Sequence, residues 1–144
     1  MSISVRRVVL SGLMAGAIEL VLKIIAGAMY LDALFREAIE RVDPALMANV
    51  GSTPGVIGFV TFTLLLGVSA MYIYAAMRPR FGTRLATVVS ATLAAWAVES
   101  LNWGIVGLIG LFSWWHIGSE AMITLAIIFL AVYTGSMLYK DTPP

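Results

Sequence analysis

The sequence contains no cysteine and only one histidine, His116. Without cysteine the chain cannot form a disulfide, a thiolate metal site or a cysteine-bound iron–sulfur cluster. A lone histidine does not by itself supply a two-histidine haem ligation or a multi-histidine metal site. We therefore expect no cofactor and no bound metal.

Charged residues are also scarce. They make up 12% of the 144 residues, whereas 60% are hydrophobic. A soluble domain is about 45–50% apolar and about 25% charged, so this composition indicates an integral membrane protein whose main partner is the lipid bilayer. So little polar sequence leaves no room for a separate soluble domain, and we expect one domain over 1–144. The net charge of +1 gives no reason to expect nucleic acid binding.

Long hydrophobic runs are what the sequence does contain. Four segments can each span about 30 Å of hydrocarbon at about 1.5 Å per residue, namely about 8–35, 55–77, 85–112 and 114–139. The first resembles a signal peptide because Arg6 and Arg7 precede it, but it is too long and contains charges, so we interpret it as a retained helix. The proline in "RPRFGT" is expected to end the second helix, and the bend at "LFSWWHIGS" is short. We predict an all-α, antiparallel four-helix bundle.

The basic residues favour one orientation. With four spans, Arg6, Arg7, Arg78, Arg80, Arg84 and Lys140 share one side, whereas only Arg36 and Arg41 fall on the other. The positive-inside rule then places both termini in the cytoplasm, as in a bacterial-type inner-membrane protein.

The longest connection, on the outer side, shows helical periodicity. Its apolar residues recur every three or four positions, at Phe35, Ile39, Val42, Leu46 and Val50. The pair Asp43–Pro44 can cap and start a helix. We expect the first helix to overrun the membrane and a short amphipathic helix to follow, ending at Gly51 and lying on the outer interface or over the bundle end. A lid on the bundle is the favoured interpretation, and a partner-docking surface is the alternative.

Glu19 and Lys23 lie near the middle of the first span. They are four residues apart with the acid first, so they share a helix face in the order that favours an ion pair. Gly12 and Gly16 lie on that face too, which predicts close packing against another helix. The face therefore points into the protein.

The third span offers a partner for this pair. Counted from the cytoplasmic ends, Lys23 and Glu99 are both about 21–23 Å deep at about 1.5 Å per residue. Thr92 and Asn102 share the helix face of Glu99. We predict a buried network of Glu19, Lys23, Glu99 and Asn102, in which one acid can be protonated. Such a network can couple ion movement, bind a small molecule, or serve structure and assembly.

A second group of residues lies at the outer rim of the bundle. Trp114, Trp115 and His116 begin the fourth span, where amphipathic aromatics form an ordinary interfacial belt. Glu120 follows within two turns and can reach water or cap the helix start. A ligand site at this rim is the alternative interpretation.

Two resemblances accompany these residues. "YIYAAMRPRFGT", Tyr72 to Thr83, resembles the end of the second helix in small bacterial four-helix membrane proteins, which implies an inner-membrane location and no known activity. The small multidrug resistance transporters are also short and four-spanning, with a membrane glutamate in the first helix that Glu19 would match. Lys23 and the long outer loop depart from that pattern, so the likeness is distant.

These features support two hypotheses of different classes. The first is a non-catalytic protein that acts through assembly, as an accessory subunit or homo-oligomer, because several helices carry small residues suited to tight contacts. The second is a small ion- or proton-coupled transporter that uses Glu19, Lys23 and Glu99. No nucleophile–base pair, zinc-protease motif or phosphate-binding loop is visible, so we do not expect an enzyme.

Overall fold

The computed structural model describes residues 4–43 and 45–139. The described chain is almost entirely helical, and no described residue belongs to a strand. Its elements are α1 (Val5–Ala26), the π-helical turn η1 (Gly27–Leu31), α2 (Asp32–Val42), α3 (Ala45–Val50), α4 (Thr53–Phe81), α5 (Arg84–Leu108) and α6 (Trp114–Leu138). Pro44 and Lys140, which entered the predictions above, lie outside the described residues.

Four helical stretches are long and apolar enough to cross a membrane. They are Val5–Val42, which runs unbroken through α1, η1 and α2, and the single helices α4, α5 and α6. The prediction of an all-α protein with four candidate spans is confirmed, and the chain is a multi-pass membrane protein. The first helix also extends well past Phe35, as the outer-loop periodicity predicted.

Two predicted helix ends were wrong. The α4 helix continues through Pro79 to Phe81, and Gly82 ends it with a φ of 69°. Proline in a last turn removes a hydrogen bond without ending the helix, whereas glycine adopts a positive φ without steric cost. At the other end, α5 stops at Leu108 rather than at 112, before Gly110 turns the chain with a φ of 78°.

Three of the long helices have a serine or threonine as the N-cap residue. Ser52 Oγ accepts a hydrogen bond from the Gly55 amide at 3.2 Å, and Ser113 Oγ accepts one from the His116 amide at 3.2 Å. Thr83 Oγ1 accepts from the Ala86 amide at 3.3 Å. These caps satisfy amides that the first helical turn leaves without a backbone partner, so the short connections set where each span starts.

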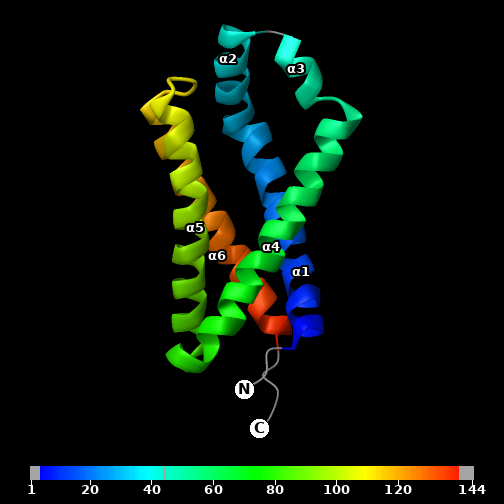
Figure 1. Ribbon diagram of the computed structural model, residues 1–144, viewed down its shortest axis with the longest axis vertical. Helices are drawn as coiled ribbons and strands as arrows, with labels where there is room; N and C mark the ends of the chain where they lie inside the picture. The colour runs from blue at the N-terminus through cyan, green and yellow to red at the C-terminus, as the bar shows by residue number, and fades with distance from the viewer. Residues whose placement is uncertain (1–3, 44, 140–144) are drawn as a thin grey trace.

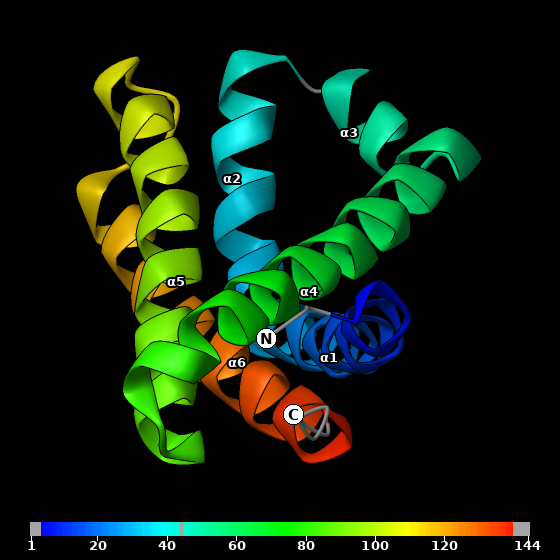
Figure 2. The ribbon, with the colours of Figure 1, turned by 60° about the horizontal axis from the view of Figure 1, so that its bottom comes forward.

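The helices pack tightly at one end of the molecule and spread at the other (Figure 1). The start of α1, the turn between α4 and α5 and the end of α6 lie at the tight end. At the opposite end, α2 and the beginning of α4 diverge, and α3 links them (Figures 1 and 2). This spread opens space between the helices at the end that carries α2 and α3.

Glycines bring α1 and α4 into backbone contact. A Cβ atom built on Gly67 would lie 2.2 Å from the Gly16 amide nitrogen, and one on Gly12 would lie 2.4 Å from Val68 Cα. No side chain fits in that space, so the two helices pack through their main chains. The Gly12–Gly16 face points into the protein, as predicted.

The buried apolar residues form two clusters. The larger joins α1, α4, α5 and α6 towards the tight end and includes Met71, Tyr74 and Val88. The smaller, near the spread end, consists of Ala38, Ile39, Phe112 and Ile117.

The short helix of the outer loop contacts the bundle only in part, through Met47, which packs against the smaller cluster. The short helix α3 exists, but none of its residues is buried, and Leu46 and Val50 are exposed. Val42 is exposed too, so only the first part of the predicted stripe packs on the bundle. The ends of α2 and α4 diverge, and α3 links them (Figure 1).

Candidate functional site: a buried lysine beside a cavity

Lys23 lies between two carboxylates. Its Nζ atom is 2.9 Å from Glu19 Oε1 and 2.9 Å from Glu99 Oε1. The side chains of Lys23, Glu19 and Glu99 are only 14%, 3% and 15% exposed. The three groups therefore form a buried cluster of one base and two acids.

The cluster joins two helices that do not pack closely on each other. Both α1 and α5 pack mainly against α4 and α6. Glu19 and Lys23 are one turn apart on α1, and the long lysine side chain reaches across to Glu99 on α5. A flexible four-carbon stem allows this span, which a short side chain would not reach.

Asn102 does not belong to the cluster, contrary to the prediction. It is exposed, and its Nδ2 donates to the Val98 carbonyl of its own helix at 2.9 Å. Residues three apart on a helix differ by about 60° in direction, whereas residues four apart differ by about 40° in the opposite sense. On α5 it is Trp103, four residues after Glu99, that continues the face towards the other helices.

A cavity of about 580 Å³ lies against this cluster. Lys23 on α1 and Glu99 on α5 form part of its wall, and each of the other helices contributes at least one residue, α3 through Val50 alone. The remaining lining residues are Gly27, Leu31, Asp32, Phe35, Val50, Gly55, Val56, Phe59, Trp103, His116, Glu120 and Ile127. Most of them belong to the halves of their helices that lie towards α2 and α3, so the cavity lies between the diverging helix ends.

The residues predicted at the outer rim separate into two pairs. Trp114 and Trp115 are 62% and 75% exposed and do not line the cavity. His116 is buried, its ring lies 4.6 Å from that of Phe112, and it lines the cavity. Glu120 lines the cavity too and accepts a hydrogen bond from Thr124 Oγ1 at 3.2 Å. Two of the four rim residues thus share one cavity with Lys23 and Glu99.

Sequence analysis did not place Glu120 near the Lys23 cluster, although the positions of the two residues along their helices indicate a similar depth in the membrane. Glu120 lies six residues inside α6, which is about 9 Å from the outer end at about 1.5 Å per residue. Lys23, about 22 Å from the inner side of a core about 30 Å thick, lies at a similar level. Counting from both surfaces would have brought the two residues together.

A π-helical turn lies directly beside the cluster. It covers Gly27–Leu31, one turn after Lys23, and Gly27, Leu31 and Asp32 line the cavity. A Cβ on Gly27 would lie 2.7 Å from Asp32 Oδ1, so glycine leaves room for that carboxylate. Such turns are rare, and many of them occur at functional sites.

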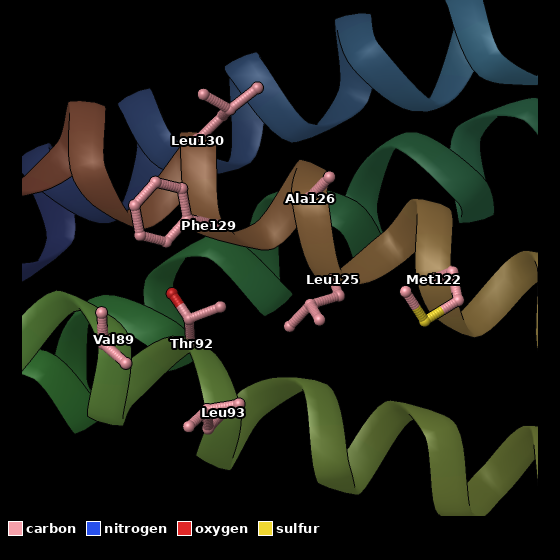
Figure 3. A pocket seen from close by; sticks show the side chains of 8 residues that line it. All are labelled: Val89, Thr92, Leu93, Met122, Leu125, Ala126, Phe129 and Leu130. Carbon is pink, nitrogen blue, oxygen red and sulfur yellow. The ribbon is translucent and has the colours of Figure 1, made fainter.

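A second hollow lies on the outer surface between α5 and α6 (Figure 3). It measures about 510 Å³ and is lined by Val89, Thr92, Leu93, Met122, Leu125, Ala126, Phe129 and Leu130. Thr92 is its one polar lining residue and is buried, although sequence analysis assigned it to the face of Glu99. The chemistry of this groove is that of a lipid-facing surface, because no charged side chain lines it.

Comparisons of the chain with protein-family models, with curated proteins and with solved structures find no match. Among the described residues, no group of three or more histidine or acidic side chains is arranged to hold a metal ion. A functional assignment therefore rests on the buried cluster and the cavity above it.

Proposed function

We propose that the chain is a bacterial-type inner-membrane protein whose four spans run antiparallel, with both termini in the cytoplasm. The arginines support this orientation, since Arg6, Arg7, Arg78, Arg80 and Arg84 belong to the tight end of the molecule. The opposite end carries the acidic residues of α2. In this arrangement α2 is the amphipathic outer element, because Ala38 and Ile39 are buried while its charged residues are exposed.

Within this arrangement, the chain acts as a small ion- or proton-coupled transporter. One observation carries the proposal, namely the position of Lys23 Nζ at 2.9 Å from both Glu19 and Glu99. One ammonium group cannot neutralise two carboxylates. When all three groups are ionised, the cluster has a net charge of −1.

The excess negative charge of the cluster is costly in the membrane interior, and binding of a positive charge would neutralise it. A charged side chain at the bilayer centre costs at least about 2.5–3.5 kcal/mol, and ionisable residues inside spans commonly mark ion pathways. Uptake of a proton or a cation removes the excess. The cluster therefore has two charge states, a net charge of −1 and a neutral state after it takes up a proton or a cation. Exchange between these two states is the elementary step of coupling.

The cavity supplies access to the cluster. Lys23 and Glu99 line it directly, whereas Glu19 is 2% exposed and lies behind Lys23. Of the two acids of the cluster, protons or solutes that enter between the diverging ends of the helices would meet Glu99 before Glu19. Glu99 is thus the proposed exchange group, and Glu19 is the acid that retains the lysine.

The test is a flux measurement on the Glu99→Gln variant in proteoliposomes. Glutamine keeps the size of the side chain but cannot take up or release a proton, so we expect pH-driven flux to fall to the level of empty liposomes. Glu40→Gln, the same change at an exposed site on α2, should retain flux. If Glu99→Gln lowers the melting temperature in detergent yet leaves flux unchanged, the cluster is structural and the proposal fails.

Assembly, as an accessory subunit or homo-oligomer, stays a prediction and ranks second. The sequence supported assembly through the small residues on several helices, but three of these glycines make close contacts with other helices of the same chain. Gly12 and Gly16 contact α4, and a Cβ on Gly135 would lie 2.8 Å from Met71 Sδ. Purification in a mild detergent tests it, because a monodisperse monomer with no co-purifying protein would contradict assembly.

A further inference from the structure

We infer that the groove between α5 and α6 binds a neutral, membrane-soluble carbonyl compound of the chemical class of an isoprenoid quinone. This groove of about 510 Å³ is the one drawn in Figure 3. It shares no lining residue with the cavity beside Lys23, so the inference goes beyond the proposed transport function and does not depend on it. Three features support it: an unpartnered hydroxyl group, the depth of that group in the membrane and the walls around it.

The hydroxyl group of Thr92 is the polar feature of the groove. Thr92 is 2% exposed, and its Oγ1 atom has no hydrogen-bond partner among the described residues. A threonine inside a helix commonly donates to a carbonyl one turn earlier, as Thr87 does to the Thr83 carbonyl at 2.7 Å. Figure 3 shows the Thr92 oxygen directed from α5 towards Phe129 on α6 instead. A buried polar group without a partner is costly, and a ligand that accepts this hydrogen bond would remove the cost.

The depth of Thr92 limits which molecules can supply the acceptor. Thr92 lies eight residues after Arg84, the first residue of α5, which is about 12 Å into the candidate span at about 1.5 Å per residue. The polar groups of phospholipids lie in the interfacial region, outside the hydrocarbon core of about 30 Å. Their acyl chains reach this depth but carry no acceptor. The acceptor therefore belongs to a molecule that brings its own polar group into the hydrocarbon core, as a quinone brings its carbonyl groups.

The walls of the groove favour a neutral, planar body with an aliphatic tail. None of the described lining residues is charged, so the groove has no counter-charge for a phosphate or an ammonium group. Phe129 supplies an aromatic ring beside the hydroxyl group, and this ring stacks on that of Tyr133 with centroids 6.2 Å apart. A planar ring packs well on such a face, and Leu93, Leu125 and Leu130 can contact a tail. The groove is also within the range of about 300–1,000 Å³ that small-molecule sites occupy.

Duroquinone and durene test the inference, because both are tetramethylated six-membered rings and only the quinone carries carbonyl groups. Trp96 reports binding, since it lies one turn after Thr92 at the contact of α5 with α6. The full-length protein in nanodiscs carries Trp103→Phe, Trp114→Phe and Trp115→Phe, so that Trp96 alone emits. We expect duroquinone to quench this emission saturably and durene to displace it poorly. Duroquinone should also raise the melting temperature of the protein that retains all four tryptophans.

Variants of Thr92 separate the hydroxyl group from the shape of the groove. Thr92→Val keeps the shape, and we expect it to weaken duroquinone binding about fivefold, which corresponds to one hydrogen bond between neutral groups. Thr92→Ser keeps the hydroxyl group and should retain most of the affinity. Thr63→Val is the matched control, because Thr63 is also 2% exposed but donates to the Phe59 carbonyl at 2.8 Å and lies outside the groove. Its affinity should be unchanged.

Several outcomes would overturn the inference. Quenching that rises without saturation would indicate collisions from the lipid, and equal displacement by durene would indicate an acyl-chain groove in which the carbonyl has no role. An unchanged affinity in Thr92→Val, or an equal loss in Thr63→Val, would also contradict it. So would a lower melting temperature of Thr92→Val without ligand, because the hydroxyl group would then have a partner within the chain. Flux through Glu99 is measured separately and bears only on the proposed transport function.

Discussion

At the scale of single residues, Lys23 connects α1 to α5 through its contact with Glu99 and also contacts Glu19 on its own helix. It neutralises part of the charge on Glu19 and Glu99 at 2.9 Å from each, in a region that lipid surrounds. A buried ion pair adds little net stability compared with apolar residues, but the loss of one partner leaves an uncompensated charge. The importance of Lys23 is therefore visible only when it is removed while the acids remain.

The first prediction concerns Lys23→Met. Methionine fills much of the same space without charge, so two buried carboxylates lose their partner. We expect the free energy of unfolding to fall by about 3–5 kcal/mol, measured by denaturant titration in mixed micelles. The combined variant Glu19→Gln, Lys23→Met, Glu99→Gln should recover most of this loss. A single variant as stable as the original protein would show that the acids do not need the lysine.

The sequence was informative about these residues to different degrees. The four-residue spacing of Glu19 and Lys23 and the equal depth of Glu99 led to three residues that the structure brings into contact. Asn102 was included by the same face argument but lies exposed. Asn102 lies three residues after Glu99 and therefore about 60° away around the helix axis, which directs it away from the cluster.

At the scale of helices, the contact of α1 with α4 determines how the bundle is built. Gly67 on α4 lies against the backbone of Gly16 on α1, so these two helices approach more closely than side chains allow. In lipid such close packing replaces the hydrophobic effect as a source of helix association.

The second prediction compares two glycines of α4. Gly67→Ala would bring a Cβ atom within 2.2 Å of Gly16 N, so the helices must separate. We expect a loss of about 1–3 kcal/mol in the free energy of unfolding. Gly58→Ala, where no atom lies within 4 Å of the added Cβ, should be neutral or slightly stabilising because alanine is the better helix former. Equal stability of both variants would contradict the tight contact.

Hydropathy predicted that four long helices exist, but it did not predict where they end or where the π-helical turn lies. Pro79 suggested an end that Gly82 provides instead. The π-helical turn at Gly27–Leu31 has no sequence signature, because it depends on how α1 and α2 meet their neighbours. Local rules describe a helix in isolation, and these features arise from packing.

At the scale of the whole molecule, the two ends of the bundle differ in charge and in shape. The end with the α4–α5 turn carries arginines and its helices lie close together, whereas the end with α2 and α3 carries more acids than bases and its helices diverge (Figure 1). The cavity lies between these diverging helices. If the end rich in arginine faces the cytoplasm, as proposed, the cavity is reached from the opposite, outer side of the membrane.

The third prediction tests this orientation, and the absence of cysteine makes it direct. Single cysteines at Asn49 and at Arg80, both exposed positions, should react differently with a membrane-impermeant maleimide in whole cells. We expect Asn49→Cys to be labelled and Arg80→Cys to be labelled only after the cells are broken. Labelling of Arg80→Cys in intact cells would overturn the orientation and the outward position of the cavity.

The sequence by itself determined the class of this protein. Hydropathy and length predict four helices, and a charge in lipid has to face another charge, so Glu19 and Lys23 had to point inward. Only the tertiary structure decided that Glu120, His116 and Trp103 share one cavity with Lys23 and Glu99. It also decided that Gly12, Gly16 and Gly67 make contacts within the chain and that Asn102 lies outside the buried cluster. Periodicity gives the direction of a side chain relative to its own helix, but the distance between helices depends on contacts among residues far apart in the chain.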